Sequence, residues 1–181
     1  MNMLTLALAV GAFAFAAPMA PAFATIETVE AKEAAMAAAD QARYDLIETF
    51  GDKQLRPGQY VWRDGKGGGE PRVIISLSDQ LAYLYRGDTL VAAAAISSGT
   101  TKNPTPTGIF PILAKKTMHR SKKYDNAPMP FMQRLDKYGI ALHAGHNPGH
   151  PASHGCIRLP AKFAAKLYGV TELGSEVMIG A

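Results

Sequence analysis

Residues 72–96 read RVIISLSDQLAYLYRGDTLVAAAAI, and they predict an antiparallel β-meander. Apolar side chains occupy 73–75 and 77, recur with a period of two through 81–86 and return at 90–96, as in consecutive strands. The dipeptides Ser78-Asp79 and Gly87-Asp88 separate these segments and are typical of turns. Three short strands joined by tight turns favour a mainly β fold over a Rossmann-like parallel sheet.

Further elements are predicted between the meander and the C-terminus. The predicted strands are 109–113, 138–143 and 177–179, and the predicted helix is 161–168. Pro111 cannot donate a ladder hydrogen bond, so it places its strand at the edge of a sheet. Residues 118–130 hold two prolines and show no period, which predicts a long surface loop that could cover a functional site.

The N-terminal side of the meander predicts one helix and a linker. Residues 27–50 are rich in Ala, Glu and Lys and predict an amphipathic helix ended by Gly51. The expected apolar side of this helix is Met36, Ala39, Tyr44, Ile47 and Phe50. The segment Arg56-Pro57-Gly58 and the glycine-rich residues 65–69 predict the linker.

The first 24 residues carry no charged side chain and end in prolines and the triplet Ala22-Phe23-Ala24. This pattern predicts a secretory signal peptide cleaved after Ala24, with an uncleaved membrane anchor as the alternative because no basic residue lies near Met1. The expected parts of the chain are a signal peptide at 1–24, the N-terminal helix and linker at 25–56, and a single domain at 57–181.

Charge is distributed unevenly along the chain. Residues 25–60 hold four basic and seven acidic residues, whereas residues 61–181 hold fifteen basic and eight acidic residues. The basic part would attract an anionic polymer such as a cell wall, although a solvated basic surface explains it as well. The lysines form no tract and no nucleic-acid motif is present, so nucleic acid is not an expected partner.

The residues that point to chemistry surround the single cysteine. Four of the five histidines, namely His143, His146, His150 and His154, lie within fourteen residues of Cys156. A free thiol has a pKa near 8.5, so a nucleophilic cysteine needs an imidazole to take its proton or to hold the thiolate as an ion pair. His143 ends a predicted strand, and the Gly- and Pro-rich loop after it can fold back toward Cys156.

Two alternatives compete with a cysteine nucleophile. Cys156 could be a buried and inert thiol, or the four histidines and Cys156 could bind zinc. The zinc hypothesis would group the histidines on a helix, and Gly145, Pro148, Gly149 and Pro151 disfavour a helix there. Gly155 permits a sharp turn in which backbone amides could form an oxyanion hole.

Ser153-His154-Gly155-Cys156-Ile157-Arg158 resembles the S/T-H-G-C signature of the L,D-transpeptidase family, of the YkuD type. The resemblance extends from about Pro57 to the C-terminus. It includes four other segments: Ser98-Gly99, Thr105-Pro106-Thr107-Gly108, Ala127-Pro128-Met129-Pro130 and His143-Ala144-Gly145. It implies an L,D-transpeptidase-like β-sandwich with a few short helices as the catalytic domain.

The resemblance also implies a role for each site residue. Cys156 would be the nucleophile, His143 the general base, and the main-chain carbonyl of Ala144 would orient the imidazole. Ser153, His154 and Gly155 would shape the turn and the oxyanion hole. The family often has asparagine in place of Arg158, which could bind a substrate carboxylate or form a structural salt bridge. Tyr124 and Met129 lie on the predicted surface loop and could contact the substrate or only pack.

The implied activity is peptidoglycan L,D-transpeptidation in the periplasm, as part of cell-wall biogenesis. Cys156 would release D-alanine from a tetrapeptide stem and pass the acyl group to an amine of another stem or of an envelope protein. Water as acceptor would make the chain an L,D-carboxypeptidase. A non-catalytic wall-binding protein and a zinc-dependent amidase are the other hypotheses. No cofactor is expected, and the chain is expected to be a monomer.

Overall fold

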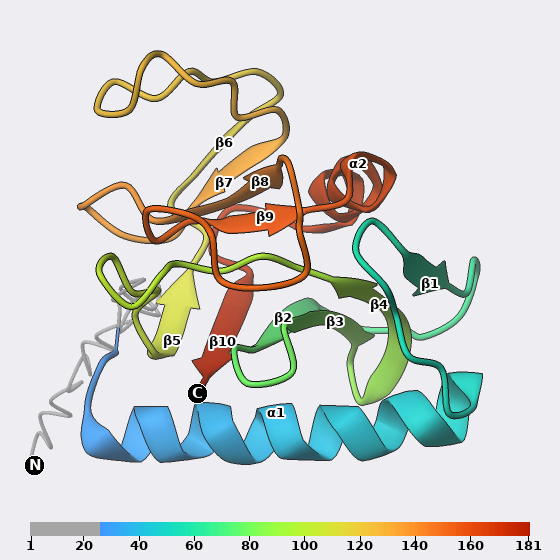
Figure 1. The fold of residues 1–181 in the computed structure, drawn as a ribbon. Coiled ribbons are helices and arrows are strands. Elements are labelled where there is room, and N and C mark those ends of the chain that lie inside the picture. The colour runs from blue at the N-terminus through green and yellow to red at the C-terminus, as the bar shows by residue number, and fades with distance from the viewer. Residues whose placement is uncertain (1–25) are drawn as a thin grey trace, which may run out of the picture.

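The computed structural model describes residues 26–181, which form three layers (Figure 1). A long helix lies on one face of a six-stranded sheet, and a four-stranded sheet covers the other face. The predicted signal peptide and its cleavage site after Ala24 lie outside the described residues. Within 26–181, no helix combines the length and the apolar character that crossing a membrane requires.

The six-stranded sheet contains the predicted meander. Its strands are β1 (Tyr60–Trp62), β2 (Pro71–Ser76), β3 (Leu81–Arg86), β4 (Thr89–Ala95), β5 (Gly108–Pro111) and β10 (Glu176–Gly180). The order is β1-β4-β3-β2-β10-β5, with β2, β3 and β4 antiparallel as predicted. The C-terminal strand β10 pairs in parallel with β2. Pro111 lies on the edge strand β5, which confirms that prediction.

The four-stranded sheet is built from short strands. They are β6 (Ala114–Lys116), β7 (Met132–Arg134), β8 (Ala141–Ala144) and β9 (Ile157–Leu159), in that spatial order. Helix α2 (Ala161–Val170) follows β9 and matches the predicted helix. Only β8 overlaps a predicted strand. Three residues are too few to show a period of two, so the sequence did not reveal β6, β7 and β9.

The main hydrophobic core lies between the two sheets. Val73 and Ile75 of β2 point into this core, whereas Ile74 points to the opposite face, as alternation along a strand requires. The four-stranded sheet contributes Leu142, Ile157 and Leu159, all with 0% exposure. Two sheets packed over one core and two helices confirm the predicted mainly β sandwich.

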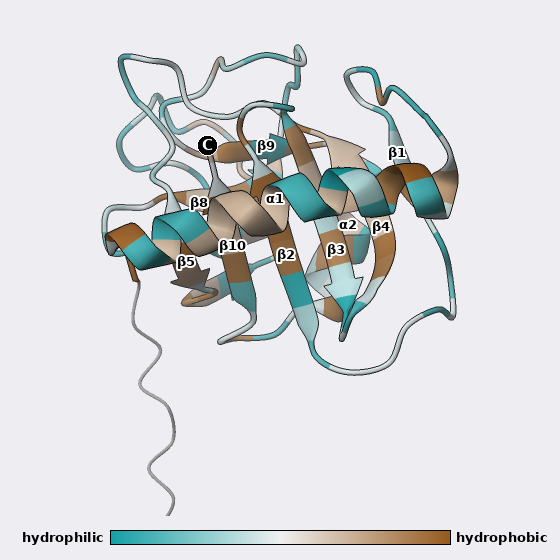
Figure 2. Cartoon of the chain, turned by 90° about the horizontal axis from the view of Figure 1, so that it is seen from below, coloured by the Kyte–Doolittle hydropathy of each residue, from teal (hydrophilic) through white to brown (hydrophobic). Residues whose placement is uncertain are grey.

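Helix α1 (Val29–Phe50) covers the outer face of the six-stranded sheet, as Figure 2 shows from below. The side chain of Thr28 caps its first turn by accepting a hydrogen bond from the Ala31 amide. Gly51 ends the helix with a φ of 82°. The predicted helix is therefore confirmed, and it packs on the sheet as part of the same folded body.

The apolar side predicted for this helix was wrong, except for Ala39 and the partly buried Phe50. Met36, Tyr44 and Ile47 are 46%, 69% and 44% exposed. The buried positions are Ala31, Ala35, Ala39, Ala42 and Leu46. Small side chains let the helix backbone approach the sheet closely: a Cβ atom at Gly180 of β10 would lie 2.7 Å from the Ala35 carbonyl oxygen. Four of the five buried side chains are alanines, so small volume rather than high hydrophobicity marks most of this face.

The segment predicted as a linker contains one short strand. Residues 60–62 form β1, which pairs with β4. The glycine-rich residues 65–69 pack against the turn between β3 and β4, where a Cβ atom at Gly67 would lie 2.7 Å from Arg86 Cβ. These glycines permit residues 65–69 to approach the β3–β4 turn closely.

Candidate active site

The parallel pairing of β8 with β9 brings the candidate residues together. Leu142 is opposite Ile157, and His143 is opposite Arg158. Leu142 and Ile157 point into the core, so His143, Cys156 and Arg158 lie on the opposite face of the sheet. The fold therefore places the only cysteine and His143 on one face of two neighbouring strands.

Cys156 immediately precedes β9, level with Ala141, and His143 is two residues further along β8. The two residues are therefore offset by roughly 7 Å along the strands and about 5 Å across them. His143 is 7% exposed, and half-buried Cys156 packs against Met129, Met132 and Ala141.

The main chain fixes the orientation of the imidazole. Nδ1 of His143 lies 2.8 Å from the carbonyl oxygen of Ala144. A carbonyl oxygen only accepts hydrogen bonds, so Nδ1 carries the hydrogen and Nε2 of the neutral ring keeps its lone pair. Gly145 makes room for this arrangement, because a Cβ atom there would lie 3.3 Å from His143 Cε1.

Burial acts on both candidate groups in the direction of the neutral form. Burial lowers the pKa of His143, the positive charge of Arg158 adds to this, and the hydrogen bond to Ala144 opposes it. Burial likewise raises the pKa of the Cys156 thiol, and Asp136 adds to this, whereas a hydrogen bond with the backbone of Ala141 and the charge of Arg158 oppose it. Both shifts thus favour the uncharged forms, a thiol and a neutral imidazole.

Asp136 is a site residue that the sequence analysis missed. Its buried Oδ1 accepts hydrogen bonds from the amides of Tyr138, Gly139 and Ile140 at 2.9, 2.7 and 2.9 Å. The loop held in this way presents the Gly139 carbonyl oxygen, which lies 3.6 Å from the Cys156 sulfur as acceptor of its S–H. Asp followed within three residues by Gly is typical of an Asx turn and was the available signal.

The turn before Cys156 is held by its own polar groups. Gly155 has a φ of 112°, and a Cβ atom there would lie 2.7 Å from Ile140 Cδ1. The Ser153 hydroxyl accepts a hydrogen bond from the Gly155 amide at 3.0 Å and donates one to the Cys156 carbonyl oxygen. Ser153 and Gly155 therefore shape the turn, and the Gly155 amide is used within it.

The segments after β4 support this turn. Thr105 Oγ1 donates to the Gly155 carbonyl oxygen at 2.8 Å and accepts from the Gly99 amide at 2.9 Å. The Ser98 carbonyl oxygen accepts the Ser153 amide at 3.0 Å. A Cβ atom at Gly99 would lie 2.9 Å from Gly155 Cα, so only glycine fits between these segments.

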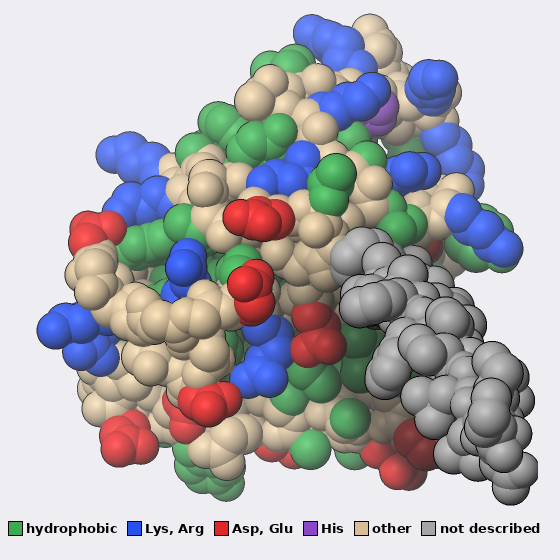
Figure 3. Space-filling model, turned by 180° about the vertical axis from the view of Figure 1, so that it is seen from behind, with side chains coloured by type: hydrophobic (Ala, Val, Ile, Leu, Met, Phe, Trp, Pro, Cys, Tyr) green, Lys and Arg blue, Asp and Glu red, His purple; other side chains and the backbone are tan. Residues whose placement is uncertain are grey.

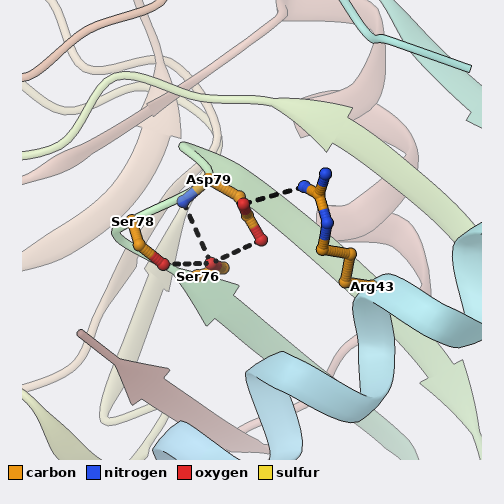
Figure 4. A network of polar contacts seen from close by, with 4 residues as sticks. All are labelled: Arg43, Ser76, Ser78 and Asp79. Atoms are coloured by element: carbon orange, nitrogen blue, oxygen red, sulfur yellow. Dashed lines mark hydrogen bonds and ion pairs between the residues drawn. The ribbon is translucent and has the colours of Figure 1, made fainter.

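Hydrogen bonds continue from this turn to the outer helix. Buried Gln80 donates to Ser98 Oγ at 2.8 Å and accepts from the Ser98 amide at 3.0 Å. Gln80 directly follows the turn between β2 and β3, where Ser76 and Asp79 bond each other and Asp79 pairs with Arg43 of α1 at 2.8 Å (Figure 4). Helix α1 thus contacts Asp79, the residue that directly precedes Gln80 in the sequence.

The loop between β6 and β7 places Tyr124 and Met129 near the candidate site. The Tyr124 ring stacks on the exposed His154 ring, with centroids 4.2 Å apart and planes 16° apart. Met129 is 8% exposed and belongs to the apolar group beside Cys156. The predicted surface loop therefore packs partly inward.

Three of the candidate histidines lie at the surface. The side chains of His146, His150 and His154 are exposed. Within residues 26–181, no three His, Cys, Asp or Glu side chains are grouped so that they could hold a metal ion.

One of the two roles predicted for Arg158, the structural salt bridge, is not observed within the described residues. The two ion pairs in the described part of the chain are Arg43–Asp79 and Lys166–Asp64, so the predicted structural salt bridge of Arg158 is not formed there. The guanidinium instead acts on the pKa of both His143 and Cys156, as a charge close to the two groups does.

Basic side chains gather above the four-stranded sheet. Figure 3 shows Lys and Arg over the upper part of the molecule, where the loop between β6 and β7 lies. Burial lowers the pKa of His119 in this loop, and the neighbouring charges of Lys116 and Lys122 lower it further. The surface beside the candidate site is therefore electropositive.

Residues 70–179 match a family model described as the L,D-transpeptidase catalytic domain, YkuD. A Bacillus licheniformis protein named L,D-transpeptidase YkuD is 29% identical over 114 residues, covering 60% of this chain and 64% of that protein. An L,D-transpeptidase structure from Mycobacterium smegmatis has a TM-score of 0.58 at 22% identity, covering 63% of this chain and 60% of the other.

A third similar protein is L,D-transpeptidase 3 from Mycobacterium tuberculosis, solved in complex with a faropenem-derived adduct. Its TM-score is 0.57 at 18% identity, and the match covers 64% of this chain and 62% of the other. The present chain thus spans less than two thirds of the length of each of these three proteins.

Proposed function

This chain belongs to the YkuD family of L,D-transpeptidases, and from that premise we propose that it is a peptidoglycan L,D-transpeptidase with Cys156 as nucleophile and His143 as general base. The family match bears out the resemblance of the Ser153–Arg158 segment. One observation carries the assignment of roles: His143 shares a sheet face with Cys156 and is oriented by Ala144 so that Nε2 can accept a proton.

The proposed first step starts from neutral groups. Nε2 of His143 takes the thiol proton as the Cys156 sulfur attacks the carbonyl carbon between the L-centre of diaminopimelate and the terminal D-alanine. The C–N bond of the tetrahedral intermediate then breaks, and the imidazolium returns the proton to the leaving amine. D-alanine departs, and the stem remains bound to Cys156 as a thioester.

The second step reverses the first with another acceptor. An amine of a second stem, or of an envelope protein, attacks the thioester carbonyl, loses its proton to His143 and releases the Cys156 thiol. Water in the same position would give the carboxypeptidase product. We propose the amides of His154 and Cys156 as oxyanion donors, because the Gly155 amide is used by Ser153.

Substrate recognition involves charge and an aromatic surface in this proposal. The guanidinium of Arg158 is unpaired by any acidic side chain within residues 26–181, and it would bind a stem carboxylate. Tyr124, stacked on His154, and Met129, beside the thiol, would contact the stem peptide. The electropositive surface above the site suits an anionic wall. We place the protein in the periplasm, acting as a monomer.

Intact-mass spectrometry tests the proposal. The purified parent chain, Cys156→Ala and His143→Ala are each incubated with a tetrapeptide muropeptide and, separately, with faropenem, since a relative was solved with a faropenem-derived adduct. We expect a covalent adduct in the parent, none in Cys156→Ala and slow formation in His143→Ala. His146→Ala is the control, because that exposed histidine lies in the same connection.

The muropeptide products identify the acceptor. Dimeric muropeptide supports the transpeptidase, whereas a trimmed tripeptide alone identifies the carboxypeptidase. Full activity of Cys156→Ala would refute the cysteine mechanism. An unmodified parent without turnover would favour a non-catalytic wall-binding protein.

A further inference from the structure

A cavity of about 440 Å³ lies outside the candidate active site. It is formed by β1, the glycine-rich segment after β1, the β3–β4 pair and α2. None of its residues belongs to the candidate active site. A volume of this size is within the range of about 300–1,000 Å³ that is usual for small-molecule sites.

The floor of this cavity is apolar and includes the only tryptophan of the chain. Trp62, Leu84, Val91 and Val170 line it. The indole of half-buried Trp62 packs edge-on against Phe163, with centroids 5.8 Å apart and planes 75° apart. This contact fixes the orientation of the indole, whose ring also lies against the cavity.

The rim of the cavity is cationic. Arg63, Lys66, Arg86 and Lys166 line it, against one carboxylate, Asp64. Lys166 Nζ lies 4.9 Å from the Trp62 ring centre and 3.2 Å from Asp64 Oδ1. Arg86 donates through Nε to the Gly69 carbonyl oxygen at 2.9 Å, a contact that leaves its terminal nitrogens for a ligand.

The charge of this rim is a local property. Another cavity of similar volume, about 460 Å³, also borders the β3–β4 turn. Its charged residues are Glu70, Asp88, Glu172 and Glu176 with Arg72 alone as a cation. The two cavities border the same turn and differ in charge, so the cationic rim belongs to this cavity and does not simply reflect the net charge of the chain.

The glycine-rich segment forms a closely fitted wall. A Cβ atom at Gly67 would lie 3.0 Å from Val91 Cγ1, and one at Gly87 would lie 2.6 Å from the Gly68 carbonyl oxygen. Gly67 and Gly87 also have φ values of 75° and 57°, which favour glycine. A segment that served only as a tether would not need this fit.

We propose that this cavity binds an anionic saccharide, with a sugar ring on the Trp62 floor and its carboxylate or phosphate held by Lys66 and Arg86. Aromatic rings offer an apolar face to the C–H groups of a sugar, and Lys and Arg bind oxyanions through charge-assisted hydrogen bonds. Lys166 would exchange its contact with Trp62 for the anion. The choice of a saccharide rests on the proposed function, because the polymer that carries stem peptides is a glycan.

Fluorescence of Trp62 tests the proposal directly, because no other tryptophan contributes. The full chain carrying Cys156→Ala is titrated with three probes that contain no stem peptide: muramic-acid glycan strands with free carboxylates, a sugar-phosphate polymer, and neutral chitooligosaccharide. We expect saturable binding of one or both anionic probes, which identifies the source of the anion, and much weaker binding of the neutral probe.

The matched variants are Lys66→Gln/Arg86→Gln and, as control, Lys53→Gln, an exposed cation outside the cavity. Loss of the charged contacts should weaken binding about tenfold or more in the double variant, whereas the control should bind like the parent. Equal binding by the double variant, equal binding of the neutral probe, or binding of anionic lipid vesicles without any saccharide binding would overturn the proposal. Acylation of the parent by a sugar-free tetrapeptide tests Cys156 separately.

Discussion

The two faces of the four-stranded sheet differ in what their side chains contact. Leu142, Ile157 and Leu159 on one face are completely buried in the core between the sheets. The other face carries His143 and Cys156, whose surroundings are a methionine cluster, a guanidinium and backbone carbonyl groups. Cys156 and Ile157 are adjacent in sequence, so one residue separates the proposed chemistry from the core.

On the face that carries His143 and Cys156, which we call the chemical face, replacement of His143 should change the acylation rate most. His143→Ala should slow acylation of Cys156 by about 10² to 10⁴, the usual contribution of a positioned general base. The rate is measured by intact mass against time with faropenem in excess. His146→Ala should acylate like the parent, and thermal unfolding of each variant confirms that the fold is retained.

The pH dependence of the same reaction follows from the burial of His143. Burial lowers the pKa of His143 below its ordinary 6.5, so the ring stays neutral and able to accept a proton into mildly acidic solution. Acylation of the parent should therefore decline only at pH below that ordinary value, as the imidazole becomes protonated. A decline centred above pH 6.5, or one that persists unchanged in His143→Ala, would contradict this assignment.

Replacements at Ile157 should act on the core face instead. Ile157→Ala should lower the free energy of unfolding by about 2–5 kcal/mol, and Ile157→Val by about 0.5–1.5 kcal/mol, through lost burial and the cavity left behind. Urea denaturation measures both, with Cys156→Ala as the neighbour from the other face, expected to change stability far less. If Ile157→Val abolished acylation without loss of stability, the core face would also determine the reaction, and the proposed division between the two faces would be wrong.

The accuracy of prediction from sequence differed between the two sheets for a physical reason. Strands β2, β3 and β4 are six or seven residues long, enough for a period of two and for turn residues at their ends to be visible. Strands β6, β7 and β9 have three residues each, and their pairing depends on tertiary contacts. The buried face of α1 was missed because its alanines pack through their small size.

The candidate site could be predicted where side-chain chemistry marks it. A single cysteine among histidines indicated Cys156 and His143, and the Gly155 turn followed from its residue type. Gln80 was missed because its partner Ser98 is 18 residues away in sequence, on a segment that only the fold brings close. Asp136 bonds the backbone amides of the loop that follows it, and its Asx-turn spacing was its only mark in the sequence. The structural salt bridge considered for Arg158 required a partner that no local sequence pattern could place.

Replacement of Asp136 should give the smallest of these effects. It tests whether the charge of Asp136 sets the reactivity of the Cys156 thiol. Asp136→Asn keeps an oxygen that can accept the amides of Tyr138, Gly139 and Ile140, but it removes a negative charge near the thiol. Because that charge raises the pKa of Cys156, its removal should lower the pKa and enlarge the thiolate fraction at neutral pH. Iodoacetamide, which has no other cysteine to modify, should then alkylate Cys156 a few-fold faster, whereas Asp88→Asn, an exposed carboxylate at the β3–β4 turn, should leave the rate unchanged.

An unchanged or slower rate in Asp136→Asn would mean that Asp136 only holds the loop that carries Gly139. A faster rate without faster acylation by faropenem would mean that proton transfer to His143, rather than the thiolate fraction, limits the reaction.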